Sequence, residues 1–143
     1  MKSEIQAALK EALKSRDKIK LETLRGLLTA MQYEEIEKKV DQLPKEACLA
    51  IIQREIKKRN EEIDFANQAK RSDLIDKLKA EIAALDAFLP PQLASEQLTE
   101  LLNGYKAKNP GMNMGVAMKT LKDSYPGQYD AKLASELAKK IFA

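Results

Sequence analysis

Leucine, isoleucine and alanine recur every three or four positions along most of this chain, which is the period of an α-helix with one buried face. No segment alternates apolar and polar residues at period two, so no strand is predicted. The spacing predicts an all-α fold of seven helices, at residues 3–15, 18–39, 44–68, 72–89, 95–108, 113–125 and 130–141.

Polar residues that favour helix starts precede several of these segments. Such side chains accept a hydrogen bond from a free backbone N–H of the first turn. A proline at residue 44 suits the start of the third helix, where its missing N–H costs nothing. The predicted N-terminal caps are Ser3 (with Gln6, a capping box), Ser72, Asn113 and Asp130.

The adjacent prolines Pro90 and Pro91 divide the chain, because proline lacks the backbone donor and restricts the residue before it. We therefore expect an N-terminal helical subdomain at 1–89, a linker at 90–93 and a C-terminal three-helix subdomain at 94–143. The turn between the second and third helices is short. It predicts that these two helices form a long antiparallel hairpin.

The composition removes several kinds of chemistry. The chain has no histidine and one cysteine, so an internal disulfide and the usual zinc sites are excluded. Cys48 lies on the apolar face of its helix and is predicted to be a buried structural thiol. The glycines at 111 and 115 indicate a loop and a helix cap, since no P-loop lysine pattern accompanies them. We therefore predict no catalytic residue, no cofactor and no metal.

The N-terminal sequence lacks the apolar run of a secretion signal, and no stretch reaches the ~20 apolar residues of a membrane span. A cytoplasmic protein without a membrane partner is expected.

Charged residues interrupt the apolar stripes of the second and third helices. Glu55, Arg59 and Glu62 fall within the third stripe, Glu35 falls within the second, and Arg25 flanks it. In the predicted hairpin Arg25 would lie near Glu55 and Arg59. Since burying a charge alone is costly, we predict a paired Arg25–Glu55–Arg59 network that sets the register of the helices. Ligand binding by the same charges is the alternative.

Residues 91–143 contain seven lysines, no arginine and five acidic residues. Lys119 and Lys122 project away from the apolar stripe of the sixth helix, and Lys132 and Lys139 share a face of the seventh. Lysines in this arrangement can contact phosphates without selecting a sequence. The alternative is that they only solvate a small helical bundle.

Several runs occur together in an order and spacing that resemble the GatB/YqeY family, specifically its small stand-alone YqeY-like proteins. The resemblance covers essentially the whole chain, and no single run is specific by itself. The runs are Leu24-Arg25-Gly26-Leu27-Leu28-Thr29-Ala30-Met31 with Glu34-Glu35-Ile36; Ile51-Ile52-Gln53-Arg54-Glu55-Ile56-Lys57-Lys58-Arg59 with Glu62-Ile63; Lys70-Arg71-Ser72-Asp73-Leu74; Phe88-Leu89-Pro90-Pro91-Gln92-Leu93; and Met114-Gly115-Val116-Ala117-Met118-Lys119 followed by Gly127 and Asp130.

The resemblance implies an all-helical protein whose C-terminal part is similar to the tail domain of the B subunit of glutamine-dependent aspartyl/glutamyl-tRNA amidotransferase. In that enzyme the tail helps to hold tRNA. The activity that this resemblance implies is carbon–nitrogen ligation with glutamine as amido-N-donor. This chain, however, lacks the residues of that enzyme's catalytic domains. Family members often carry a basic residue after the glycine that matches Gly127. Here Gln128 and Tyr129 follow it, and Tyr129 could stack on a base, although packing is the commoner role.

Three hypotheses follow from the sequence. The first is a non-catalytic accessory protein that binds tRNA or an RNA-bound complex through Lys119, Lys122, Lys132 and Lys139. The second is a protein–protein interaction module that uses the charged helices. The third is an amide-transferring ligase that acts in a complex.

Overall fold

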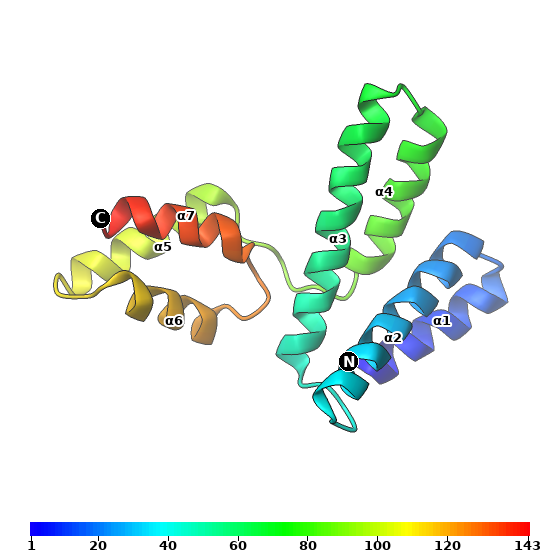
Figure 1. Cartoon of the computed structure of the whole chain (residues 1–143), viewed down its shortest axis with the longest axis horizontal. Coiled ribbons are helices and arrows are strands. Elements are labelled where there is room, and N and C mark those ends of the chain that lie inside the picture. Colours follow the sequence, from blue (N-terminus) through cyan, green and yellow to red (C-terminus); the bar gives the residue numbers. More distant parts are fainter. The chain divides into compact units, whose positions relative to one another are not determined.

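The computed structural model describes residues 1–143 and contains seven α-helices and no strand, which confirms the all-α prediction (Figure 1). The chain divides into two compact units, Met1–Leu89 and Pro90–Ala143, called here the N-terminal unit and the C-terminal unit. The helices are α1 (Lys2–Ser15), α2 (Lys18–Lys38), α3 (Lys45–Gln68), α4 (Ser72–Asp86), α5 (Ser95–Lys108), α6 (Met114–Ser124) and α7 (Ala131–Ile141).

The N-terminal unit consists of two antiparallel hairpins. Helix α1 packs along α2, α3 packs along α4, and α4 also packs against α2 (Figure 1). The sequence correctly indicated a long helical hairpin, but it indicated the wrong pair of helices. Helices α2 and α3 diverge from their connecting turn, and the main partner of α3 is α4.

The turns that follow α1, α2 and α3 share one backbone feature. Three helices are followed by a basic residue in the left-handed conformation: Arg16 (φ 60°), Lys39 (φ 57°) and Lys70 (φ 56°). At the end of α3 the N–H of Arg71 donates to the carbonyl of Ala66 at 2.9 Å, which is the long hydrogen bond of a Schellman motif. This motif reverses the chain within a few residues and returns α4 along α3.

Large aliphatic side chains form the core of the N-terminal unit. Leu24, Leu27 and Met31 of α2 are at most 2% exposed, and Ile51 and Ile52 of α3 are fully buried. Fully burying a side chain of this size contributes about 1.5–3 kcal/mol. The predicted apolar stripes are therefore what hold these helices together.

The C-terminal unit is a three-helix bundle of α5, α6 and α7, with a core of leucines and alanines. Leu98 and Leu102 of α5 and Leu121 of α6 are fully buried. The alanines that face them add little bulk between the helices. They are Ala117, Ala134 and Ala138, each fully buried.

Two of the four predicted caps are present. Asn113 Oδ1 accepts a hydrogen bond from the N–H of Val116 at 2.9 Å, and Asp130 Oδ1 accepts one from the N–H of Lys132 at 2.8 Å. The predictions for Ser3 and Ser72 are wrong, because α1 already begins at Lys2 and Ser72 is itself the first residue of α4. Neither helix start carries a side-chain cap hydrogen bond.

Residues 90–93 belong to the C-terminal unit rather than forming a free linker. The N–H of Leu93 donates to the carbonyl of Gln128 at 2.6 Å, and Gln92 Nε2 donates to the carbonyl of Gly127 at 2.7 Å. Gly127 has a φ of 72°, a conformation that favours glycine. Residues 92 and 93, which follow the double proline, are thus hydrogen-bonded to the turn before α7.

Candidate functional site

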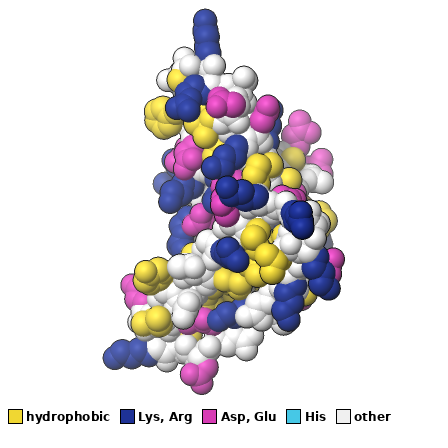
Figure 2. Space-filling model, turned by 90° about the vertical axis from the view of Figure 1, so that its right-hand side faces the viewer, with side chains coloured by type: hydrophobic (Ala, Val, Ile, Leu, Met, Phe, Trp, Pro, Cys, Tyr) yellow, Lys and Arg dark blue, Asp and Glu magenta, His cyan; other side chains and the backbone are white.

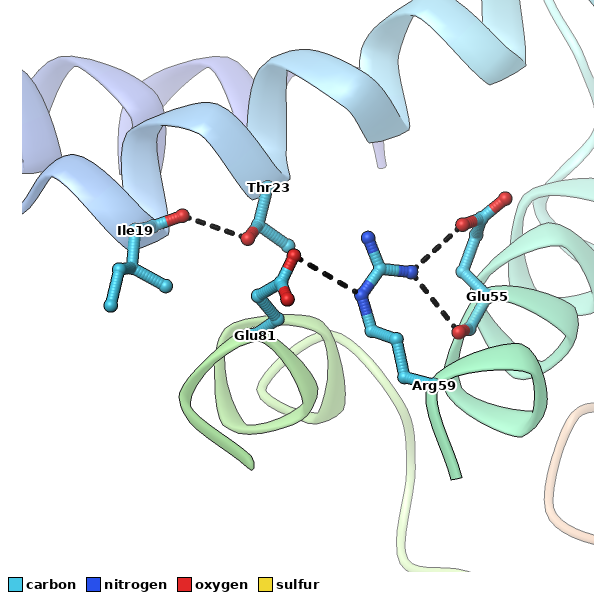
Figure 3. A network of polar contacts seen from close by, with 5 residues as sticks. All are labelled: Ile19, Thr23, Glu55, Arg59 and Glu81. Atoms are coloured by element: carbon cyan, nitrogen blue, oxygen red, sulfur yellow. Dashed lines mark hydrogen bonds and ion pairs between the residues drawn. The ribbon is translucent and has the colours of Figure 1, made fainter. Parts of the chain in front are cut away.

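A partly buried polar cluster joins α3 to α4 (Figure 3). Arg59 Nη1 donates to Glu55 Oε2 at 2.8 Å and to the Glu55 carbonyl at 3.1 Å. Arg59 Nε lies 3.6 Å from Glu81 Oε1, which is an ion pair but too long for a hydrogen bond. The Arg59 side chain is only 17% exposed, so these contacts are shielded from water.

The structure brings Glu55 and Arg59 together but leaves Arg25 outside the cluster. Arg25 is exposed and makes none of these ion pairs, because α2 diverges from α3 instead of running along it. Glu81 of α4 occupies the expected place beside Arg59. Its sequence signal is its position three residues after Leu78 and four before Leu85, on the apolar face of α4. Glu62 is exposed.

Helix α2 contributes a buried hydroxyl beside this cluster. Thr23 is 4% exposed, and its hydroxyl donates to the carbonyl of Ile19 at 2.7 Å (Figure 3). Arginine has no acceptor and keeps its proton in proteins, so Arg59 can bind an anion but cannot act as a general base. Two carboxylates already bracket it. The cluster therefore fits helix positioning better than ligand capture.

Glu35 forms a second buried ion pair, at the end of α2. It is 6% exposed, accepts from Lys2 Nζ at 2.9 Å and accepts from the N–H of Leu43 at 3.2 Å. The hydrogen bond from Lys2 lowers the pKa of Glu35 below its usual value, although burial of the carboxylate opposes this shift. One carboxylate thus connects α1, α2 and the turn before α3.

Next to Glu35 lies a cavity of about 220 Å³. Cys48 lines it, is 4% exposed and has its Sγ 4.0 Å from the carbonyl of Leu43. Burial raises the pKa of the Cys48 thiol, so it stays protonated at neutral pH, and its predicted burial is confirmed. A neutral thiol beside an ion-paired carboxylate is not an activated nucleophile with a base.

The four lysines predicted to contact phosphate are all exposed on α6 and α7. All five ion pairs of the structure lie in the N-terminal unit, so no lysine of the C-terminal unit is within 4.0 Å of a carboxylate oxygen. Another lysine there, Lys106, donates to the carbonyl of Ile141 at the end of α7 at 2.7 Å. Lys119, Lys122, Lys132 and Lys139 have no such contact.

Three tyrosines gather in the core of the C-terminal unit. Tyr105, Tyr125 and Tyr129 pack against its buried leucines and alanines. Burial raises the pKa of Tyr105 and of Tyr129, and Tyr129 is only partly exposed. The structure therefore gives Tyr129 a packing role.

No group of three or more cysteine, aspartate and glutamate side chains is arranged to hold a metal ion. No helix is both long and apolar enough to cross a lipid bilayer.

The space-filling view in Figure 2 shows positive and negative side chains interspersed with small apolar patches on the face that it presents.

Comparison with known protein families gives a match over nearly the whole chain. A family model described as Yqey-like protein matches residues 2–142. The chain belongs to this family.

Among curated proteins, this Yqey-like chain is similar to the protein named Altered inheritance of mitochondria protein 41, mitochondrial, from Lachancea thermotolerans. The two sequences are 28% identical over an alignment of 117 residues, and the match covers 78% of this chain. The match covers 63% of the length of the yeast protein.

Proposed function

We propose that this Yqey-like protein is a non-catalytic accessory protein that binds tRNA, or a complex containing it, through the C-terminal unit. The observation that carries the proposal is the contrast in charge pairing. The N-terminal unit contains every ion pair, whereas Lys119, Lys122, Lys132 and Lys139 are exposed and have no carboxylate partner. Their positive charge is available to an external anion.

The physical basis is release of the cations that surround a nucleic acid. Each phosphate contact makes the slope of log K against log salt concentration more negative by about 0.7–0.9. Such contacts give affinity without selecting a sequence. Four lysine contacts would therefore contribute a slope of roughly −3 to a plot of log K against log salt. The likeness of the C-terminal part to an amidotransferase tail supports tRNA as the nucleic acid.

The test is a titration of total tRNA at 50 and 200 mM salt. Replacing Lys119, Lys122, Lys132 and Lys139 with glutamine should weaken binding and flatten the salt dependence by about three units of slope. A matched control changes four exposed lysines of the N-terminal unit by the same charge: Lys10, Lys14, Lys57 and Lys58. Equal losses in both variants, or no loss in either, would remove the proposal.

Docking of a protein partner is the second candidate, and an exposed apolar stripe favours it. Tyr33 and Ile36 of α2 are 72% and 68% exposed and lie three residues apart on the helix, and Val40, just beyond the end of α2, is 41% exposed. Residues spaced in this way can anchor a partner helix. If this is the main function, Ile36→Asp should abolish capture of a protein that survives nuclease treatment, and the lysine variant should retain it.

A ligase activity of the chain itself has weaker support. The buried thiol is protonated, Glu35 is held by Lys2, and Arg59 cannot accept a proton. An amide-transferring role would therefore have to come from another member of a complex. Turnover by the purified chain with glutamine and ATP would contradict the proposal of a non-catalytic protein.

A further inference from the structure

The cavity beside Glu35 brings together ionisable groups, apolar walls and empty space within the N-terminal unit. Its volume is about 220 Å³, and its lining comes from α1, α2, the following turn and the first turn of α3. The two groups of this unit whose pKa is displaced, Glu35 and Cys48, both line it. Displaced pKa values in a cavity are a mark of binding sites.

The walls and the volume limit what the cavity can hold. Met31, Leu43 and Cys48 line the interior and are at most 5% exposed, so the deep part is apolar. Drug-sized ligands occupy pockets of roughly 300 Å³ or more, and this cavity is smaller. The occupant is therefore a small molecule with an apolar body.

The charges of the lining favour an anion. Glu35 is already satisfied by Lys2 and by the N–H of Leu43, which makes that pair nearly neutral. Lys45 also lines the cavity, is exposed and has no carboxylate partner, so it leaves a positive charge at the rim.

The start of α3 adds to this charge. Lys45 is the first residue of this 24-residue helix, and the preceding Pro44 supplies no side-chain cap. The N–H groups of Lys45 and Glu46 therefore remain free at the positive end of the helix dipole, whereas the N–H of Ala47 donates to the carbonyl of Pro44 at 3.0 Å. A carboxylate beside Lys45 would satisfy both.

From this arrangement we propose that the cavity is a binding site for a small monocarboxylate with an apolar body. The body enters between Met31, Leu43 and Cys48, and the carboxylate remains near Lys45 and the start of α3. The site is independent of the lysines proposed to bind tRNA. Because it touches α1, α2 and α3, an occupant would stabilise the N-terminal unit by mass action.

The experiment uses the full chain with ¹³C-methyl methionine and benzoate as the probe. The ring current of benzoate should shift the Met31 methyl signal saturably, with a dissociation constant of roughly millimolar order. The methyl signals of Met112, Met114 and Met118 in the C-terminal unit serve as internal controls. Benzoate should also slow alkylation of Cys48 by iodoacetamide.

Lys45→Gln should weaken benzoate binding about three- to fivefold, whereas Lys58→Gln, a change of an exposed lysine on the same helix, should leave it unchanged. The uncharged analogue benzamide should bind more weakly than benzoate. Equal shifts of all methionine signals, no saturation at Met31, or equal affinities for benzamide and benzoate would overturn the proposal.

Discussion

The two units of this protein differ in whether ion pairs connect their helices. In the N-terminal unit, acidic and basic side chains connect helices: Glu35 pairs with Lys2 across α2 and α1, and Arg59 pairs with Glu81 across α3 and α4. In the C-terminal unit no ion pair forms, and leucines and alanines hold the helices together. The first unit uses a few of its charges to fix its own geometry, and the second uses none of its lysines in an ion pair.

The largest expected effect tests the apolar basis of the C-terminal unit. Leu98 is fully buried, and Leu98→Ala removes the three carbon atoms of its isopropyl group and leaves a cavity. The free energy of unfolding of this unit should fall by about 2–5 kcal/mol. Urea denaturation followed by the ¹³C-methyl signal of Met118 measures it. A loss below about 1 kcal/mol would show that the bundle does not depend on this leucine.

The ion pairs of the N-terminal unit provide the next comparison. Arg59→Ala leaves Glu55 and Glu81 partly buried without their cation, and the free energy of unfolding should fall by about 1–3 kcal/mol. Arg25→Ala is the matched control, because Arg25 is exposed and lies on α2 outside the cluster. It should change stability by no more than about 0.5 kcal/mol. Equal losses of stability from the two changes would show that Arg25 contributes to the cluster as much as Arg59 does.

Two of the predicted helix caps can be compared: Asp130 accepts hydrogen bonds from backbone N–H groups, and Ser72 does not. Asp130→Ala removes the acceptor for the first N–H groups of α7 and should cost about 1 kcal/mol in chemical denaturation. Ser72→Ala removes no cap hydrogen bond and should be near neutral. A larger loss at Ser72 than at Asp130 would contradict the observed helix starts.

Acid should weaken the pair formed by Glu35 and Lys2. Because the pKa of Glu35 is lowered on folding, its contribution is full above the ordinary value of 4.5 and is lost as the pH falls through the lower folded value. The stability difference between the wild-type protein and Glu35→Gln should therefore shrink between pH 7 and pH 3. Urea denaturation at both pH values checks it, and a difference that grows on acidification would contradict it.

The lysines of the C-terminal unit should matter least for stability. Since none of the four proposed phosphate contacts has a carboxylate partner, each replacement by glutamine should change the free energy of unfolding by less than about 0.5 kcal/mol. Thermal and urea unfolding of the quadruple variant measure this directly. A folded variant with normal stability also makes any loss of tRNA binding attributable to charge.

The sequence predicts elements well and their pairing less well. Periodicity locates all seven helices within a few residues, because each has an apolar face at helical spacing. The pairing of α3 with α4 depends on a left-handed turn at Lys70, and a lysine gives no signal for a positive φ. The misplaced hairpin then put Arg25 beside Arg59.

The polar sites show the same limit. Glu55, Arg59 and Glu35 were found because each interrupts an apolar stripe, and Glu81 interrupts the stripe of α4 in the same way. Helical spacing alone could not pair Glu81 with Arg59, since that contact depends on how two helices meet. The cavity beside Glu35 also has no sequence signal, because empty space arises only from packing.

The contacts of Gln92 and Leu93 with the turn at 127–128 have a practical consequence for truncation. A fragment that starts at residue 94, where the predicted C-terminal subdomain begins, loses the hydrogen bonds that Gln92 and Leu93 donate to the carbonyls of Gly127 and Gln128. A fragment that starts at Pro90 keeps both hydrogen bonds. The double proline is thus better regarded as the beginning of the second unit than as spare chain between two units.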